Sequence, residues 1–149
     1  VSVGDFKFTV VPASHETIET DSDGNHRFVG YVMEIAGLRI YHSGDCIPFD
    51  GQAELLRPFA IDLALLPING RDDIRRSNGV PGNFTIDEAI GLCRNAGIDN
   101  LLCHHFDMFD FNTIDREYAR KTLEEKAPFL QWLLPQLKTT YIITSEVIN

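Results

Sequence analysis

The chain has 149 residues, of which 44% are hydrophobic and 23% charged, and this composition is typical of one soluble globular domain or a large part of one. Its net charge of −9 disfavours nucleic acid and anionic membrane surfaces as partners, so we expect a small-molecule substrate. No apolar run reaches the roughly 18 residues of a membrane span, and three cysteines without a Cys-x-x-Cys pair favour a reducing cytoplasm.

The first third of the chain predicts strands. Residues 6–11 are aromatic and β-branched, which is typical of a strand, and a polar loop follows over 17–27. Two apolar runs, 28–35 and 38–42, are joined at Ala36-Gly37 and predict an antiparallel β-hairpin. The chain is therefore predicted to begin with three consecutive strands, the last two of which form a hairpin.

The remainder predicts alternating helices and strands. Thr85 and Glu88 form a capping box at the start of a helix that should end at Gly97. The predicted elements are a short helix over 49–56, a buried strand over 61–66, a loop over 71–82, a helix over 85–96, a strand over 99–103, helices over 115–126 and 129–137, and a last strand over 140–143. This order favours an α/β layered domain.

Residues that bind metals in proteins follow three of the predicted strands directly. They are His15, Asp45, and one of the neighbours His104 and His105. Side chains that leave strands at the same edge of a sheet can converge on one site. Imidazole and carboxylate groups suit zinc, iron or manganese. The alternative is that Asp45 is a turn aspartate and the histidines are structural.

Two other interpretations of the polar residues are weaker. Residues 21–25 contain Asp-x-Asp-Gly, as calcium loops do, but they lack the closing glutamate of an EF-hand. A serine triad built on Ser14 or Ser43 would lack the Gly-x-Ser-x-Gly nucleophile elbow. We therefore take the metal site as the leading hypothesis.

Four segments carry a resemblance to a known family. They read Pro-Ala-Ser-His at 12–15, Ile-Tyr-His-Ser-Gly-Asp at 40–45, Leu-Leu-Pro-Ile-Asn-Gly at 65–70 and His-Phe-Asp-Met-Phe at 105–109. In this order they resemble the metallo-β-lactamase superfamily, and within it the L-ascorbate-6-phosphate lactonase-like branch. The resemblance extends from the first predicted strand to beyond Asn112.

The resemblance implies an αββα sandwich around a centre of one or two divalent metal ions, with zinc or manganese preferred and iron as a further option. His15 would bind the first metal, Asp45 would bridge both as the catalytic carboxylate, and His105 would bind the second. A metal-bound hydroxide would then attack a sugar lactone or a similar ester. Arg71 and Asn83 would contact a phosphate or the hydroxyl groups of that substrate.

One departure from the family pattern matters. The family's His-x-His-x-Asp-His motif is absent from the 149 residues. We therefore expect residues 1–149 to form a single domain that resembles the C-terminal half of such a sandwich. Its three donors, divided over two metals, would need completion by a chain carrying the other half or by a homo-oligomer. The rivals are a non-catalytic half-domain, inactive alone, and a phosphodiesterase or nuclease on the same fold.

Overall fold

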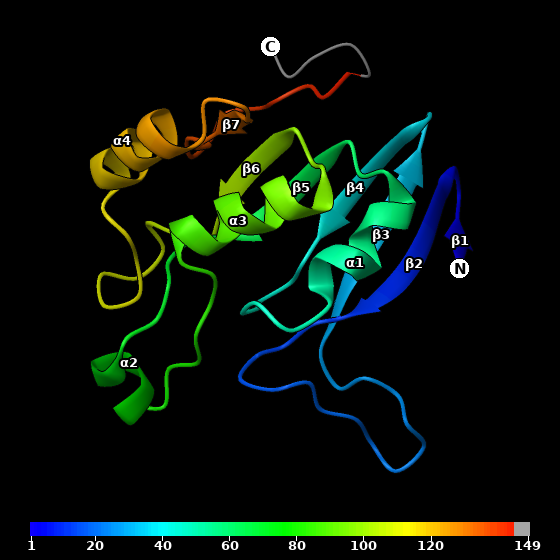
Figure 1. Cartoon of the computed structure of the whole chain (residues 1–149), viewed down its shortest axis with the longest axis horizontal. Coiled ribbons are helices and arrows are strands. Elements are labelled where there is room, and N and C mark those ends of the chain that lie inside the picture. Colours follow the sequence, from blue (N-terminus) through cyan, green and yellow to red (C-terminus); the bar gives the residue numbers. More distant parts are fainter. Residues whose placement is uncertain (145–149) are drawn as a thin grey trace.

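A seven-stranded sheet, whose strand order follows the sequence, forms the centre of the molecule (Figure 1). The computed structural model describes residues 1–144. Strands β1 to β4 pair antiparallel, and β4 to β7 pair parallel. The strands are β1 (Ser2–Val3), β2 (Phe6–Pro12), β3 (Val29–Ile35), β4 (Leu38–His42), β5 (Leu63–Pro67), β6 (Asn100–His104) and β7 (Gln131–Leu133).

The helices connect the parallel strands. Helices α1 and α3 lie across the same face of the sheet, and α4 packs against α3 (Figure 1). Among residues 1–144, no helix is both long and apolar enough to cross a membrane. The helical segments are α1 (Gln52–Leu56), the 3-10 turn η1 (Arg57–Phe59), α2 (Asp73–Ser77), α3 (Ile86–Ala96) and α4 (Arg116–Lys126).

The predicted hairpin is present as β3 and β4. Its turn consists of Ala36 and Gly37, whose φ angles are 49° and 82°. Two positive φ angles are typical of the tight turns that match the twist of paired strands, and glycine adopts them without strain. The register pairs Ile35 with Leu38 and Tyr31 with His42. The chain after β4 is thereby directed to the sheet edge where β2 ends.

The predicted capping box begins α3. The Thr85 hydroxyl accepts a hydrogen bond from the Glu88 amide at 3.3 Å, and the Glu88 carboxylate accepts one from the Thr85 amide at 2.8 Å. The helix ends at Gly97, whose φ of 73° is the left-handed C-cap conformation. Sequence signals close to the helix termini were therefore sufficient to locate this element.

Alternation along the strands separates the two faces of the sheet. On the helical face, Val32, Tyr41 and Leu66 are fully buried in the core. On the opposite face, Val10 and Tyr31 are 52% and 41% exposed. The strand register joins these two residues to a row that continues across the sheet through His42, Leu65, Leu102 and Leu133. This row is largely apolar, and no helix of the described residues covers it.

Three predictions in the connecting segments differ from the structure. The predicted helix over 129–137 is wrong, because Gln131–Leu133 forms β7, which pairs with β6. Pro128 and Pro135 flank this segment and disfavour a continuous helix. The strand predicted over 140–143 is also wrong, since those residues belong to no strand. The loop predicted over 71–82 contains α2, whose N-cap Asp72 accepts a hydrogen bond from the Arg75 amide at 2.8 Å.

Candidate metal centre

Asp45 lies between two histidines at one edge of the sheet. His15 follows β2, Asp45 follows β4 and His105 follows β6. The His15 Nε2 lies 4.0 Å from Asp45 Oδ2, and the His105 Nε2 lies 3.3 Å from Asp45 Oδ1. The two carboxylate oxygens of Asp45 thus face different imidazole rings. A carboxylate that binds two metals, each with its own histidine ligand, has the same arrangement.

The three side chains are partly open to solvent. The exposed fraction is 25% for His15, 47% for Asp45 and 20% for His105. The hydrogen-bonding contact with His105 lowers the pKa of Asp45, although partial burial opposes this shift. The same contact raises the pKa of His105. Asp45 is therefore ionised at neutral pH, and its charge is available at the sheet edge.

The backbone around these residues is closely constrained. A Cβ atom at Gly30 in β3 would lie 2.8 Å from the carbonyl oxygen of His42, so only glycine permits this approach. Gly44, just before Asp45, has a φ of 65°. His105 has a φ of 61°, which is costly for a residue with a side chain. Such strain is concentrated at functional sites, where the surrounding structure maintains it.

His104 lies beside the centre but not in it. Its ring is 4.8 Å from that of His42, measured between centroids. Burial, together with the charges of His42 and His105, lowers the pKa of His104 to about 4. Its Nε2 is buried and has no hydrogen-bond partner among residues 1–144. The structure places His105, rather than His104, in contact with Asp45.

Arg71 and Asn83 occupy a second polar cluster. Arg71 binds the Glu88 carboxylate through both terminal nitrogens, with two distances of 2.6 Å, and also donates to the carbonyl oxygen of Asn83 at 3.0 Å. The Asn83 Oδ1 is buried and accepts a hydrogen bond from the Cys46 amide at 2.9 Å. The structure therefore brings these residues together, but it directs both toward protein groups. Their role in substrate binding stays a prediction.

A hollow beside His105 was not predicted from the sequence. It has a volume of about 390 Å³, and its walls include Phe106, Arg116, Pro135 and Leu137. Arg116 donates hydrogen bonds to the carbonyl oxygens of Leu134 and Pro135, which ties the segment after β7 to the start of α4. No short sequence pattern predicts this hollow, because its lining residues lie up to 33 positions apart, from His104 to Leu137, and meet only in the fold.

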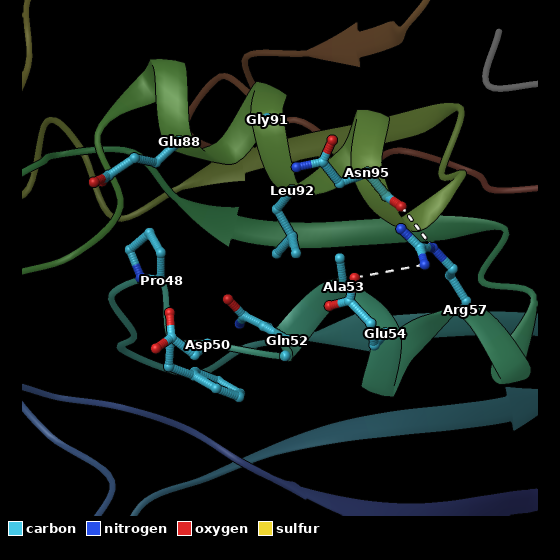
Figure 2. Close-up of a pocket in the computed structure, with 12 residues that line it drawn as sticks. Pro48, Asp50, Gln52, Ala53, Glu54, Arg57, Glu88, Gly91, Leu92 and Asn95 are labelled. Carbon is cyan, nitrogen blue, oxygen red and sulfur yellow. Dashed lines mark hydrogen bonds and ion pairs between the residues drawn. The ribbon is translucent and has the colours of Figure 1, made fainter.

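A second hollow lies between α1 and α3 (Figure 2). It also has a volume of about 390 Å³, and Gln52 and Glu88 are among the residues that line it. Arg57 crosses one end, where its Nε donates to the carbonyl oxygen of Asn95 at 2.9 Å. Its lining contains none of His15, Asp45 and His105. Of the two hollows, only the one beside His105 adjoins the candidate metal centre.

The donor set fits a metal in kind but not in number. Imidazole nitrogens and a carboxylate are suitable ligands for zinc, manganese or iron. Within residues 1–144, no three His, Cys, Asp or Glu side chains form a ready-made metal-binding group. His15 and His105 approach Asp45 from two sides rather than one common point. These residues therefore fit part of a metal centre, and further ligands are required to close it.

The mixed sheet, with helices on one face and ligand-type residues at the ends of β2, β4 and β6, defines an α/β domain of the metallo-β-lactamase class. A family model described as "Beta-lactamase superfamily domain" matches residues 1–106. The chain belongs to this superfamily. The fold class predicted from the sequence is confirmed, whereas the lactonase-like branch is not established by this match.

Curated relatives give a more specific likeness. The chain is 27% identical over 129 residues to a UPF0173 metal-dependent hydrolase of Methanoculleus marisnigri, and the match covers 83% of this chain and 52% of that protein. It is 45% identical over 69 residues to a UPF0173 metal-dependent hydrolase of Thermococcus onnurineus, covering 43% of this chain and 29% of the relative. The chain thus spans about half the length, or less, of these relatives.

Solved structures confirm the fold. Igni18, a metallo hydrolase from Ignicoccus hospitalis, superimposes with a TM-score of 0.65 at 19% identity, covering 89% of this chain and 50% of that protein. An isothiocyanate hydrolase from Delia radicum gut bacteria superimposes with a TM-score of 0.70 at 15% identity, covering 91% of this chain and 54% of its own. At these identities the likeness concerns the arrangement of strands and helices.

Proposed function

We propose that this chain supplies one part of the active site of a metal-dependent hydrolase, with His15, Asp45 and His105 as metal ligands. The observation that carries the proposal is that each oxygen of Asp45 faces the Nε2 of a different histidine. The names of the curated relatives, which are metal-dependent hydrolases, support the reaction class. Asp45 would bridge two divalent ions, and each histidine would bind one of them.

The residues of this chain would position rather than perform the bond-breaking step. When bound, a divalent metal supplies a Lewis acid that activates water and stabilises negative charge on the substrate oxygen. Asp45 is ionised at neutral pH and fixes the charge of the centre. The hollow beside His105 would hold the substrate next to the metal. Zinc or manganese suits these ligands best, with iron as a third option.

For the substrate, we propose a small lactone or similar ester, in keeping with the resemblance to the lactonase-like branch. A phosphorylated sugar lactone would require a cation near the site. Arg71, the predicted candidate, is already paired with Glu88. Its use would therefore require that ion pair to open. The net charge of −9 disfavours nucleic acid as the main substrate.

A second polypeptide surface would complete the centre. A catalytic zinc typically requires three protein ligands, so three donors shared between two metals are too few. In addition, the sheet face carrying Val10, Tyr31, Leu65 and Leu102 has no helix over it among residues 1–144. We propose that a chain with the missing ligands, or a second copy of this one, covers that face. Burial of its apolar side chains would drive the association.

Metal content per chain, measured by elemental analysis alongside the intact mass, tests the proposal. One or two equivalents of zinc, manganese or iron support it, and lactone hydrolysis is then assayed on the same sample. Metal-free protein that also takes up no zinc in titration would contradict it and favour the non-catalytic half-domain. Light scattering on the same sample shows whether two copies associate, as a dimer formed through the uncovered sheet face would require.

A further inference from the structure

Cys46 connects the loops that carry His15 and Asp45. It follows Asp45 directly and is fully buried, unlike its half-exposed neighbour. Its Sγ accepts a hydrogen bond from the amide of Ser14 at 3.3 Å, and Ser14 directly precedes His15. The same thiol donates to the carbonyl oxygen of Ile47 at 3.1 Å. One buried sulfur atom therefore forms hydrogen bonds with the residue before His15 and with a residue just after Asp45.

Two further hydrogen bonds hold these loops. The amide of Ile47 donates to the carbonyl oxygen of Ser14 at 2.7 Å, which pairs the two loops through their backbones. The Cys46 amide donates to Oδ1 of Asn83 at 2.9 Å, and Asn83 is itself 2% exposed. The amide of Asn83 donates to the carbonyl oxygen of Gly70 at 3.2 Å. The Asp45 loop is thus fixed to the loop after β5 as well as to the His15 loop.

Helix α1 also contacts the same sulfur atom, through Gln52. Gln52 is buried, and its Nε2 lies 3.8 Å from Cys46 Sγ and 3.2 Å from the hydroxyl of Tyr41 in the core. Gln52 is labelled in Figure 2, where it comes from the first turn of α1. The Cys46 sulfur is therefore held by both loops and by the first turn of α1.

We propose that Cys46 and Asn83 are positioning residues that set the separation of His15 and Asp45, a role that rests on the proposed function. Neither side chain touches the metal or the substrate in this assignment. Cys46 acts by accepting a hydrogen bond from the Ser14 amide, and Asn83 acts by accepting one from the Cys46 amide. Outer partners of this kind orient metal ligands, and their loss typically lowers metal affinity 10- to 100-fold.

We call the hydrogen bonds from the Ser14 amide to Cys46 Sγ and from the Cys46 amide to Asn83 Oδ1 the loop clamp. Amide hydrogen exchange on the metal-free chain tests this clamp directly. Cys46→Ala removes the acceptor of the Ser14 amide, and we expect that amide to exchange about tenfold faster. Cys46→Ser retains a donor and an acceptor and should restore much of the protection. Asn83→Ala should accelerate exchange of the Cys46 amide, whereas Asn83→Asp keeps an acceptor oxygen and should not.

Cys93→Ala provides the matched control, because Cys93 is equally buried but belongs to α3 and not to either loop. It lowers stability without removing a loop hydrogen bond. If Cys46→Ala and Cys93→Ala accelerate the Ser14 amide equally, the clamp is refuted, whether or not the chain binds metal. If the clamp holds but zinc affinity, measured by calorimetry with zinc alone, is the same in Cys46→Ala and Cys93→Ala, the positioning role is refuted. Failure of the wild-type chain to bind zinc would instead contradict the proposed function.

Discussion

Two polar clusters, one around Asp45 and one around Arg71, contain residues that the sequence singled out, but they differ in how their charges are satisfied. Asp45 is 47% exposed, and imidazole nitrogens lie 3.3 and 4.0 Å from its two carboxylate oxygens. Arg71 and Glu88 form a two-pronged ion pair with both distances at 2.6 Å. The first cluster has capacity for a ligand, whereas the second is closed by its own partner. Unsatisfied donors and acceptors, rather than charge itself, distinguish a candidate site from a structural ion pair.

The pKa shifts follow the same contrast. Burial raises the pKa of Glu88, but hydrogen bonds from Arg71 and from Thr85 outweigh it, and the net pKa is lowered. The pKa of Arg71 is raised, mainly by its hydrogen bonds to the Glu88 carboxylate. Both groups of this pair are therefore charged over a wide pH range and are held by each other. The following substitutions break or sharpen this difference between the clusters.

Asp45→Ala should have the largest effect. The variant loses the carboxylate that both histidines face, so we expect zinc affinity, measured by calorimetry, to fall more than about 100-fold. Stability should change little, because Asp45 is half-exposed and its loss creates no cavity. Asp50→Ala is the control, because it removes a carboxylate that lines the hollow between α1 and α3 instead of the candidate metal centre. Unchanged zinc affinity in Asp45→Ala would remove Asp45 from the site.

His105→Ala should lower zinc affinity about tenfold or more, because it deletes one of the proposed metal ligands while leaving Asp45 in place. His104→Ala should leave the affinity unchanged, since His104 contacts His42 rather than Asp45. The pair of variants is matched in residue type and position. The opposite pattern would show that the ligand register is displaced by one residue.

Arg71→Met should cost about 2 kcal/mol of stability at neutral pH, because a partly buried Glu88 carboxylate loses a charged partner. The lowered pKa of Glu88 means that its contribution is present above the ordinary pKa of glutamate and is lost as the pH falls through the lowered value. Without Arg71 this pKa rises. The acid unfolding midpoint, followed by circular dichroism, should then move to higher pH while zinc affinity stays at the wild-type level. A large loss of zinc affinity would instead connect the two clusters.

Thr85→Ala should give the smallest effect. It removes the side-chain acceptor at the N-cap of α3, and such changes cost about 1 kcal/mol. Glu88 keeps both of its hydrogen bonds to Arg71, so the ion pair should survive. Urea denaturation measures the stability change, and Thr85→Ser should restore it. A loss as large as that of Arg71→Met would show that the cap and the ion pair form one unit.

The sequence by itself determined the elements whose signals are local. The Ala36-Gly37 turn, the Thr85 capping box and the alternating apolar runs each act over a few residues, and the hairpin and α3 are present as predicted. The same holds for the positions of His15, Asp45 and His105 at strand ends. The helix predicted over 129–137 was wrong, because residues 131–133 form a strand whose partner, β6, is distant in sequence.

Only the tertiary structure decided which of these groups meet and which are already occupied. The parallel register of β4, β5 and β6 brings His105 to Asp45 across 60 residues of chain. The fold also pairs Arg71 with Glu88, and it places Asn83 where its Oδ1 accepts a hydrogen bond from the Cys46 amide. Side-chain hydrogen bonds between distant segments depend on loop conformations set by the packed core, and no short sequence pattern encodes them.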